Sequence, residues 1–177
     1  MSIIKPNNNT ISAITALPFD VGITMADNFR LTTSFTGDAN PISSNWERND
    51  TSPALSSFGS QISESSGIFT FPSTGIYKVI FTAQFSYNGD DTYVNPIIQA
   101  TNNNSSYATA TTSASHITRN SSAQTESTVY LDQLFDIGDV SNQKVRFRIA
   151  VEDQATTIQG ASTYDATAVR FIRLGDT

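Results

Sequence analysis

Apolar and polar side chains alternate in short runs along most of the chain. Between Ile76 and Tyr87 the odd positions carry aromatic or aliphatic side chains, and the even positions are mostly polar. A period of two places these two sets on opposite faces of a strand. The polar set also contains Ile76 and Ile80, so this strand is predicted to be fully buried on one face and half covered on the other.

Similar runs predict further strands, separated by turn signals. The predicted strand segments are residues 29–35, 68–71, 93–101, 106–117, 125–136, 144–152 and 164–174, with a long connection carrying one or two short strands over residues 38–66. The turns are predicted at residues 72–75, at Asn88-Gly89 and at Gly138-Asp139. Pro96 indicates an edge strand or a bulge, because proline cannot donate to a strand ladder. No window has helical periodicity over ten or more residues. About eight to ten short strands predict an all-β fold of the sandwich, barrel or jelly-roll type.

The first 26 residues do not share this pattern. Their apolar residues follow no clean period, and Pro6 and Pro18 interrupt the stretch. One interpretation is a loose terminus with a short first strand, and the other is an extended arm that buries its apolar residues on another protein. The arm hypothesis divides the chain into a docking arm at 1–26 and one β-domain at 27–177. The arm residues proposed to dock are Ile3, Ile4, Ile11, Ile14 and Leu17.

Composition narrows the function classes. The 177-residue chain has no cysteine, which excludes disulfides and thiolate metal sites, and it has a single histidine. The formal net charge of −6 argues against a nucleic-acid-coating role. No segment has the length and apolarity of a membrane span, and the first residues lack the apolar core of a signal peptide.

Candidate catalytic and metal-binding groups are sparse. His116 would have to serve any serine triad, but no Gly-x-Ser-x-Gly turn accompanies it, so we interpret it as a surface or interface residue. The pairs Asp90-Asp91 and Glu152-Asp153 read as solvated turn charges. Calcium is the one candidate ion, with Asn88, Asp90 and Asp91 as oxygen donors, but the residue spacing of an EF-hand loop is absent. No catalytic residue, cofactor or metal is therefore assigned.

Lys144, Arg146 and Arg148 occupy alternate positions of one predicted strand. They therefore point the same way. Such a row could contact a phosphate group or an acidic partner. It could equally be a solvated or interface face, and charged edges also oppose aggregation.

Three segments resemble the complement one-q globular head family, which shares the tumour-necrosis-factor-like (TNF-like) jelly roll. The first runs from Gly67 through Pro72 and Gly75-Ile-Tyr77 to Phe81, the second is residues 131–139 with its Gly138-Asp139 turn, and the third is residues 168–175. The resemblance covers roughly residues 29–175. The Trp46-Glu47-Arg48 piece before Gly67 and the N-terminal arm resemble a variant found in virion proteins of marine bacteriophages, and the collagen stalk of animal members is absent.

The resemblance implies a TNF-like jelly-roll β-sandwich that forms a homotrimer. It further implies a structural virion protein, assembled in the host cytoplasm, that decorates a capsid, forms a head fibre or belongs to the tail, and that contacts other virion proteins through the arm. The alternative is a receptor-binding tip for host glycans, with Trp46 and Tyr107 as candidate surface-binding residues; an enzyme acting on sugar polymers is disfavoured. Candidate core or trimer aromatics are Tyr77, Phe81, Phe85, Phe147 and Phe171.

Overall fold

The computed structural model describes residues 22–120 and 123–177, and the proposed docking residues of the arm lie outside this part of the chain. Its regular structure consists of strands in two antiparallel sheets. Sheet A contains β1 (Met25–Leu31), β2 (Phe35–Thr36), β3 (Trp46–Arg48), β4 (Ser57–Phe58), β7 (Gly75–Tyr87), β11 (Thr125–Ile137), β13 (Thr157–Ile158) and β14 (Ala168–Gly175). Sheet B contains β5 (Ser63–Ser65), β6 (Ile68–Thr70), β8 (Asp91–Thr101), β9 (Ala108–Thr112), β10 (Ser115–Ile117) and β12 (Lys144–Val151). Among the described residues, no helix is present that could cross a membrane.

The long strand β7 organises sheet A. It pairs with β11 along its whole length, from Thr125 opposite Tyr87 to Ile137 opposite Gly75. Its other edge pairs with β14 and, near the far end, with β13. β14 then pairs with β1, whose outer edge pairs with β3 and β4. The prediction of a strand buried on one face and half covered on the other is confirmed, because burial alternates along nearly all of β7.

Sheet B is built around β8 and β12, which pair from Lys144 opposite Thr101 to Val151 opposite Val94. Pro96 was expected at an edge or a bulge, yet β8 is an inner strand. β9 pairs with β8 only from Ile97 onward, and β10 only at Val94 and Asp91. Pro96 therefore sits at the gap between these two partner strands, where no donor from proline is needed.

The two sheets pack face to face, and their inner faces form the core. Tyr77, Phe81, Phe85, Phe147 and Phe171 are all fully buried. Phe69 lies at the centre, with its ring centroid 5.1 Å from that of Phe147 and 5.5 Å from that of Phe171. Aromatic clusters of this kind contribute packing energy beyond their buried area. The aromatics proposed as core or trimer residues thus lie inside the subunit.

Two glycines of the Gly67–Gly75 segment have a steric reason. Gly67 has a φ of +79°, and a Cβ there would lie 2.2 Å from the carbonyl oxygen of Ile42. Gly75 has a φ of +147°, and a Cβ there would lie 2.7 Å from the carbonyl oxygen of Gly175. Only glycine allows the chain to turn this closely against its neighbours.

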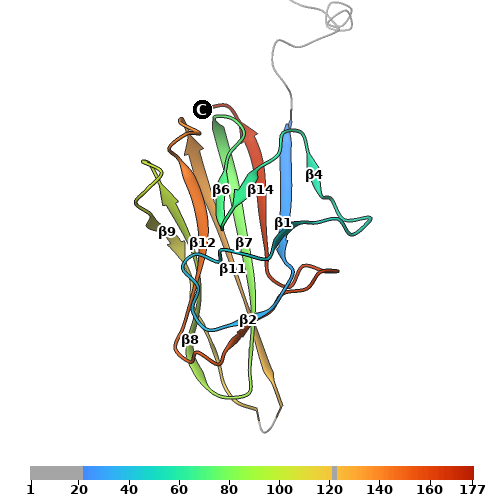
Figure 1. Ribbon diagram of the computed structural model, residues 1–177, viewed down its shortest axis with the longest axis vertical. Coiled ribbons are helices and arrows are strands. Elements are labelled where there is room, and N and C mark those ends of the chain that lie inside the picture. The colour runs from blue at the N-terminus through green and yellow to red at the C-terminus, as the bar shows by residue number, and fades with distance from the viewer. Residues whose placement is uncertain (1–21, 121–122) are drawn as a thin grey trace, which may run out of the picture.

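The chain enters and leaves the sandwich at the same end. β1 and β14 are antiparallel, with Met25 opposite Arg173, so the start of β1 lies beside the end of β14 (Figure 1). β1 begins at Met25, two residues before the predicted domain boundary. The predicted Asn88-Gly89 turn lies between β7 and β8, but these strands belong to different sheets, so it connects the two layers and does not close a hairpin.

Candidate functional surfaces

The outer face of sheet A carries apolar side chains that the subunit leaves uncovered. Tyr130 and Leu134 of β11 are 55% and 58% exposed. They alternate with Val129 and Leu131, which are buried in the core. We define the apolar face by its outward residues from β7, β11 and β14: Ile76, Ile80, Tyr130, Leu134 and Ile172.

An ion pair lies within this apolar face. Lys78 Nζ is 2.7 Å from Asp132 Oδ2 and bridges β7 and β11, with both side chains partly exposed. The hydrogen bond to Asp132, followed by the coulombic attraction, raises the pKa of Lys78 above its ordinary value. The register brings Leu134 and Ile172 to either side of Lys78. The apolar residues of this face therefore surround one internally neutralised pair, with the exposed Asp136 opposite Ile76 and with Arg170 opposite Ile80.

A shallow pocket of about 320 Å³ adjoins the apolar face. It lies beside β1 and β14, and Leu55, which is 56% exposed, forms part of its wall. Ala26, Ala54 and Ile172 supply further apolar lining, and Asn28, Asp165 and Arg170 supply polar groups. This hollow can accept an apolar side chain from a neighbouring molecule.

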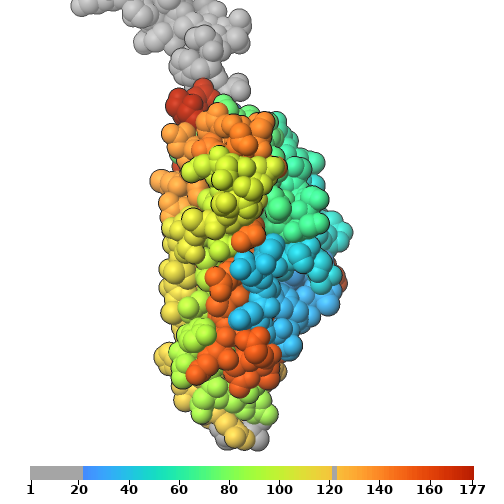
Figure 2. All heavy atoms as spheres, turned by 60° about the vertical axis from the view of Figure 1, so that its left-hand side comes forward, coloured from blue at the N-terminus to red at the C-terminus, as the bar shows by residue number. Residues whose placement is uncertain are grey.

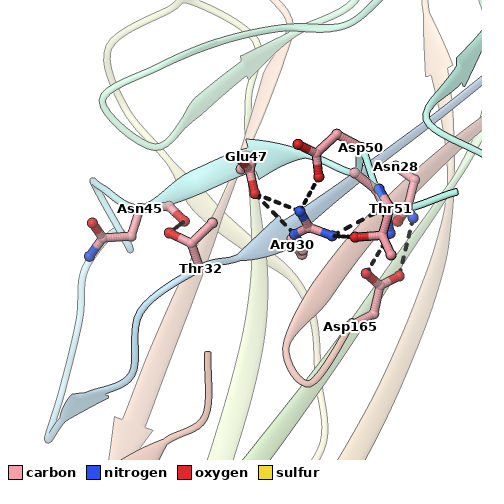
Figure 3. A network of polar contacts seen from close by, with 9 residues as sticks. Asn28, Arg30, Thr32, Asn45, Glu47, Asp50, Thr51 and Asp165 are labelled. Carbon is pink, nitrogen blue, oxygen red and sulfur yellow. Dashed lines mark hydrogen bonds and ion pairs between the residues drawn. The ribbon is translucent and has the colours of Figure 1, made fainter. Parts of the chain in front are cut away.

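A network of polar side chains lies on the outer face of sheet A, around β1 and β3 (Figure 3). Arg30 points away from the core, yet only 1% of its side chain is exposed. Its Nε and Nη2 donate to Glu47 Oε2 at 3.0 and 2.8 Å, its Nη1 donates to Thr51 Oγ1 at 2.7 Å, and Nη2 also bonds to Asp50. Burial opposes the charge on Arg30, but the bonds to Glu47 and Asp50 outweigh it and hold the pKa above its ordinary value.

Asp165 ties a second loop to the same network. Its carboxylate accepts from Asn28 Nδ2 at 3.1 Å, from Asn49 Nδ2 at 2.7 Å and from Arg170 Nη2 at 2.9 Å. Figure 3 shows Asp165 approaching this cluster from the loop before β14, while Glu47, Asp50 and Thr51 come from β3 and the segment after it. Because every charged group here has a partner of opposite charge, the network reads as structural.

The outer face of sheet B carries basic side chains, unlike the apolar face of sheet A. Lys144, Arg146 and Arg148, the basic strip, are half-buried at alternate positions of β12, between the buried core residues Val145, Phe147 and Ile149. Arg146 Nε donates to Gln99 Oε1 at 2.8 Å, and its guanidinium carbon lies 4.2 Å from the ring centroid of Tyr107. Burial raises the pKa of Tyr107, and the charge of Arg146 partly opposes this.

The two candidate surface-binding residues have different surroundings. Tyr107 lies on the outside of sheet B against Arg146. Trp46 is half-buried in β3, its ring 5.6 Å from that of Phe69 and 6.0 Å from that of Phe147. Its Nε1 donates to the carbonyl oxygen of Ile42 at 2.9 Å. The indole of Trp46 is therefore engaged mainly with the core.

The candidate catalytic and metal-binding residues do not come together in one site. His116 is exposed in β10, in a shallow hollow with Asp90 and Thr118. Asp91 is buried and accepts from the Thr156 hydroxyl at 2.5 Å, while Asp90 accepts from the backbone of Arg119 at 2.7 Å. No group of three or more histidine, aspartate or glutamate side chains suited to a metal ion occurs within residues 22–120 and 123–177.

Sequence reasoning missed the closed network around Arg30 and the contact between Tyr107 and Arg146. The Arg30 network joins residues 17 to 21 positions apart, and Asp165 lies more than a hundred positions from its partners Asn28 and Asn49. The alternation marked Arg30 as outward-facing, and the acidic residues Glu47 and Asp50 were visible in the sequence. No local pattern, however, predicts that the second segment folds over the first.

Comparison with known proteins shows the fold class. No protein-family model matches the chain, and no curated protein matches it. Among solved structures, murine APRIL at pH 5.0 is similar with a TM-score of 0.60 and 11% identity, over 85% of this chain and 98% of that one. Murine APRIL at pH 8.5 is similar with a TM-score of 0.58, 13% identity and the same coverage. Eiger TNF from S. frugiperda is similar with a TM-score of 0.61 and 11% identity, over 88% of this chain and 95% of that one. The chain therefore has an all-β fold, as the alternating pattern predicted, and a TNF-like jelly-roll architecture, as the resemblance implied.

Proposed function

We propose that this chain is a structural protein of a bacteriophage virion: a homotrimeric jelly roll that is attached to the capsid or tail by its N-terminal arm. The observation that carries the trimer is the apolar face of sheet A. The virion role is supported by the resemblance of the Trp46–Arg48 piece, the Gly67–Phe81 segment and the arm to phage virion proteins. The proposal assigns no catalysis to the chain, which would act mechanically after assembly in the host cytoplasm.

The apolar face favours association because it leaves large side chains in water. Burying a leucine or an aromatic side chain fully contributes about 1.5 to 3 kcal/mol. Tyr130 and Leu134 are more than half exposed, and Ile76, Ile80 and Ile172 are partly exposed beside them. Closed cyclic symmetry buries such a repeated patch on every copy. The Lys78–Asp132 pair would then sit inside the interface with its charges already matched.

The course of the chain supports attachment through the arm. Residue 22 leads directly into the end of sheet A where β14 also finishes. An arm docked on a particle would hold that end of the sandwich against it. The opposite end, with the β7–β8 turn and the start of β11, would then face away from the particle.

Light scattering after size exclusion tests the trimer. A mass of three times the 19.2 kDa chain is expected for the full chain. Leu134→Asp and Tyr130→Asp place a carboxylate on the apolar face and are expected to shift the mass to one chain while leaving the far-UV spectrum of a folded β-protein. Tyr93→Asp is the matched control, because Tyr93 is 41% exposed but lies on β8 of the other sheet. A folded wild-type monomer, or equal dissociation by the control, would overturn the trimer.

Deletion of residues 1–26 tests the attachment separately. The truncated chain is expected to remain a trimer in solution but to lose binding to phage particles that lack this protein. Because β1 begins at Met25, a second deletion of residues 1–21 keeps the first strand intact and controls for damage to the fold. Particle binding by both truncated chains at wild-type affinity contradicts the role of the arm.

A second candidate function is a host-glycan adhesin, which the contact between Tyr107 and Arg146 favours. An aromatic ring held by a cation on an outer sheet face offers a rigid platform for a sugar ring. Measuring both particle attachment and glycan binding distinguishes the two functions. Particle attachment that depends on the arm, without glycan binding by the isolated protein, favours decoration, and glycan binding by the isolated protein favours the adhesin.

A further inference from the structure

The basic strip concentrates positive charge on an acidic protein. The chain has ten lysines and arginines against sixteen aspartates and glutamates, yet three of the ten stand at alternate positions of β12. Successive outward positions on a strand are roughly 6.6 Å apart, so the three charges form a line of about 13 Å. Like charges in a line repel one another, and this arrangement costs energy unless an anion lies along it.

The strip differs in its partners from five other cationic residues of the described chain. Arg30, Arg48, Lys78, Arg170 and Arg173 each form an ion pair with a carboxylate. No ion pair joins Lys144, Arg146 or Arg148 to any carboxylate in residues 22–120 or 123–177. Further along the same strand line, Glu152 is held by the backbone and hydroxyl of Thr92. The fold thus leaves the charge of the strip unmatched.

Polar groups without hydrogen-bond partners lie in and beside the strip. Arg148 of β12 pairs with Ile97 of β8, and two residues further along these strands Ala150 pairs with Asn95. The side chains of Arg148 and Asn95 therefore both lie on the outer face of sheet B. Arg148 Nε, Asn95 Oδ1 and the Tyr107 hydroxyl are buried without a hydrogen-bond partner within the described chain. Buried polar atoms usually have partners, so these three atoms are unused hydrogen-bonding groups beside the strip that an ordered water could link to a bound molecule.

The strip is accessible from one side of the molecule. Figure 2 looks onto that side, where orange atoms of β12 are visible between the yellow-green atoms around β9 and the blue atoms of the N-terminal part of the described chain. β9 and the loop before it are rich in exposed serine, threonine and asparagine. Hydroxyl and amide groups of this kind exchange hydrogen bonds with sugar hydroxyls, while the strip supplies the charge.

We propose that the basic strip, with Tyr107 as a platform, binds an acidic polysaccharide that carries carboxylate or sulfate groups. The inference rests on the second candidate function, and it names the glycan class and the site. Arginine suits both anions, because its planar guanidinium bonds them in a bidentate manner. A linear polymer matches a line of charges, and the exposed hydroxyl and amide groups of β9 and the loop before it suit the hydroxyl groups of a polysaccharide.

Binding of the full chain to dextran sulfate, alginate and neutral dextran tests the site. The wild type is expected to bind the two acidic polymers and not dextran, and to release them between about 0.1 and 1 M salt, where the screening length falls from roughly 10 to 3 Å. Arg146→Gln and Arg148→Gln are each expected to weaken binding about tenfold. Arg170→Gln is the matched control: it removes the same charge from sheet A and is expected to bind like the wild type.

The outcomes separate the site from the function. Wild-type binding by Arg146→Gln and Arg148→Gln, or an equal loss in Arg170→Gln, overturns the site. Binding of neutral glycans that these variants do not affect also overturns the site but leaves an adhesin standing. Failure to bind any polymer overturns both the site and the adhesin, and capture of an acidic protein segment in place of the polymers assigns the strip to a protein partner. Denaturant unfolding of each variant, with the free energy of unfolding as the readout, shows whether a loss of binding comes from a loss of folded protein.

Discussion

Arg30 and Arg148 both point outward from a strand of the same sandwich, yet their surroundings are opposite. Arg30 on sheet A is buried under β3 and the segment after it, and four side chains from that region accept its hydrogen bonds. Arg148 on sheet B has no carboxylate partner in the described chain, and its Nε has no hydrogen-bond partner there. A charge that the fold neutralises serves the fold, and a charge that it leaves open is available for another molecule.

The same contrast extends to the two outer faces. Sheet A presents apolar side chains around one matched pair, Lys78 and Asp132, which suits burial against a second copy of the chain. Sheet B presents the basic strip beside hydroxyl and amide groups, which suits a solvated polyanion. The two proposed functions therefore use different faces, and a trimer assembled through sheet A would leave the strip open.

The largest effect is expected from Arg30→Ala. Removing this guanidinium leaves Glu47 and Asp50 close together without their cation and opens the cover over β1. Breaking a buried pair costs about 3 to 5 kcal/mol, and the lower value applies here because both carboxylates reach solvent. Urea unfolding is the measurement, and the free energy of unfolding is expected to fall by about 3 kcal/mol.

Arg148→Ala is the matched control for that measurement. It removes the same side chain from the other face, where no ion pair is lost, so the free energy of unfolding is expected to fall by clearly less than in Arg30→Ala. A loss in Arg148→Ala as large as that in Arg30→Ala would contradict the distinction between the neutralised and the open arginine.

The strands were largely predictable because their signal is local. Alternation marked β7, β11 and β12 with the correct buried positions, since side chains on a strand must alternate between faces. The Asn88-Gly89 turn was also visible, but whether it closes a hairpin or passes between sheets depends on where β11, β14 and β12 pair. That pairing is set by contacts far apart in sequence, which a local pattern does not contain.

The candidate surfaces were predictable only in part for the same reason. The outward row of Lys144, Arg146 and Arg148 follows from β12 alone. The position of Tyr107 over Arg146 requires β9 to fold back on β8, and the burial of Trp46 requires β3 to pair with β1. The surroundings of residues on long connections, such as Trp46 and Tyr107, could therefore not be predicted from the local sequence.

The smallest effect is expected at Lys78, where replacement by methionine keeps the length of the side chain but removes its charge. Lys78 has its pKa raised above the ordinary 10.5 by its bond to Asp132. A raised pKa means that the protonated form is favoured in the folded state, so the contribution of Lys78 to stability is full below about pH 10.5. It is lost as the pH rises through the folded-state value. The difference in unfolding free energy between the wild type and Lys78→Met should therefore be constant from about pH 7 to 9.5 and shrink above that. If the difference instead grows with pH over this range, Asp132 does not stabilise the protonated form of Lys78, and the description of these two residues as a neutralised pair is wrong.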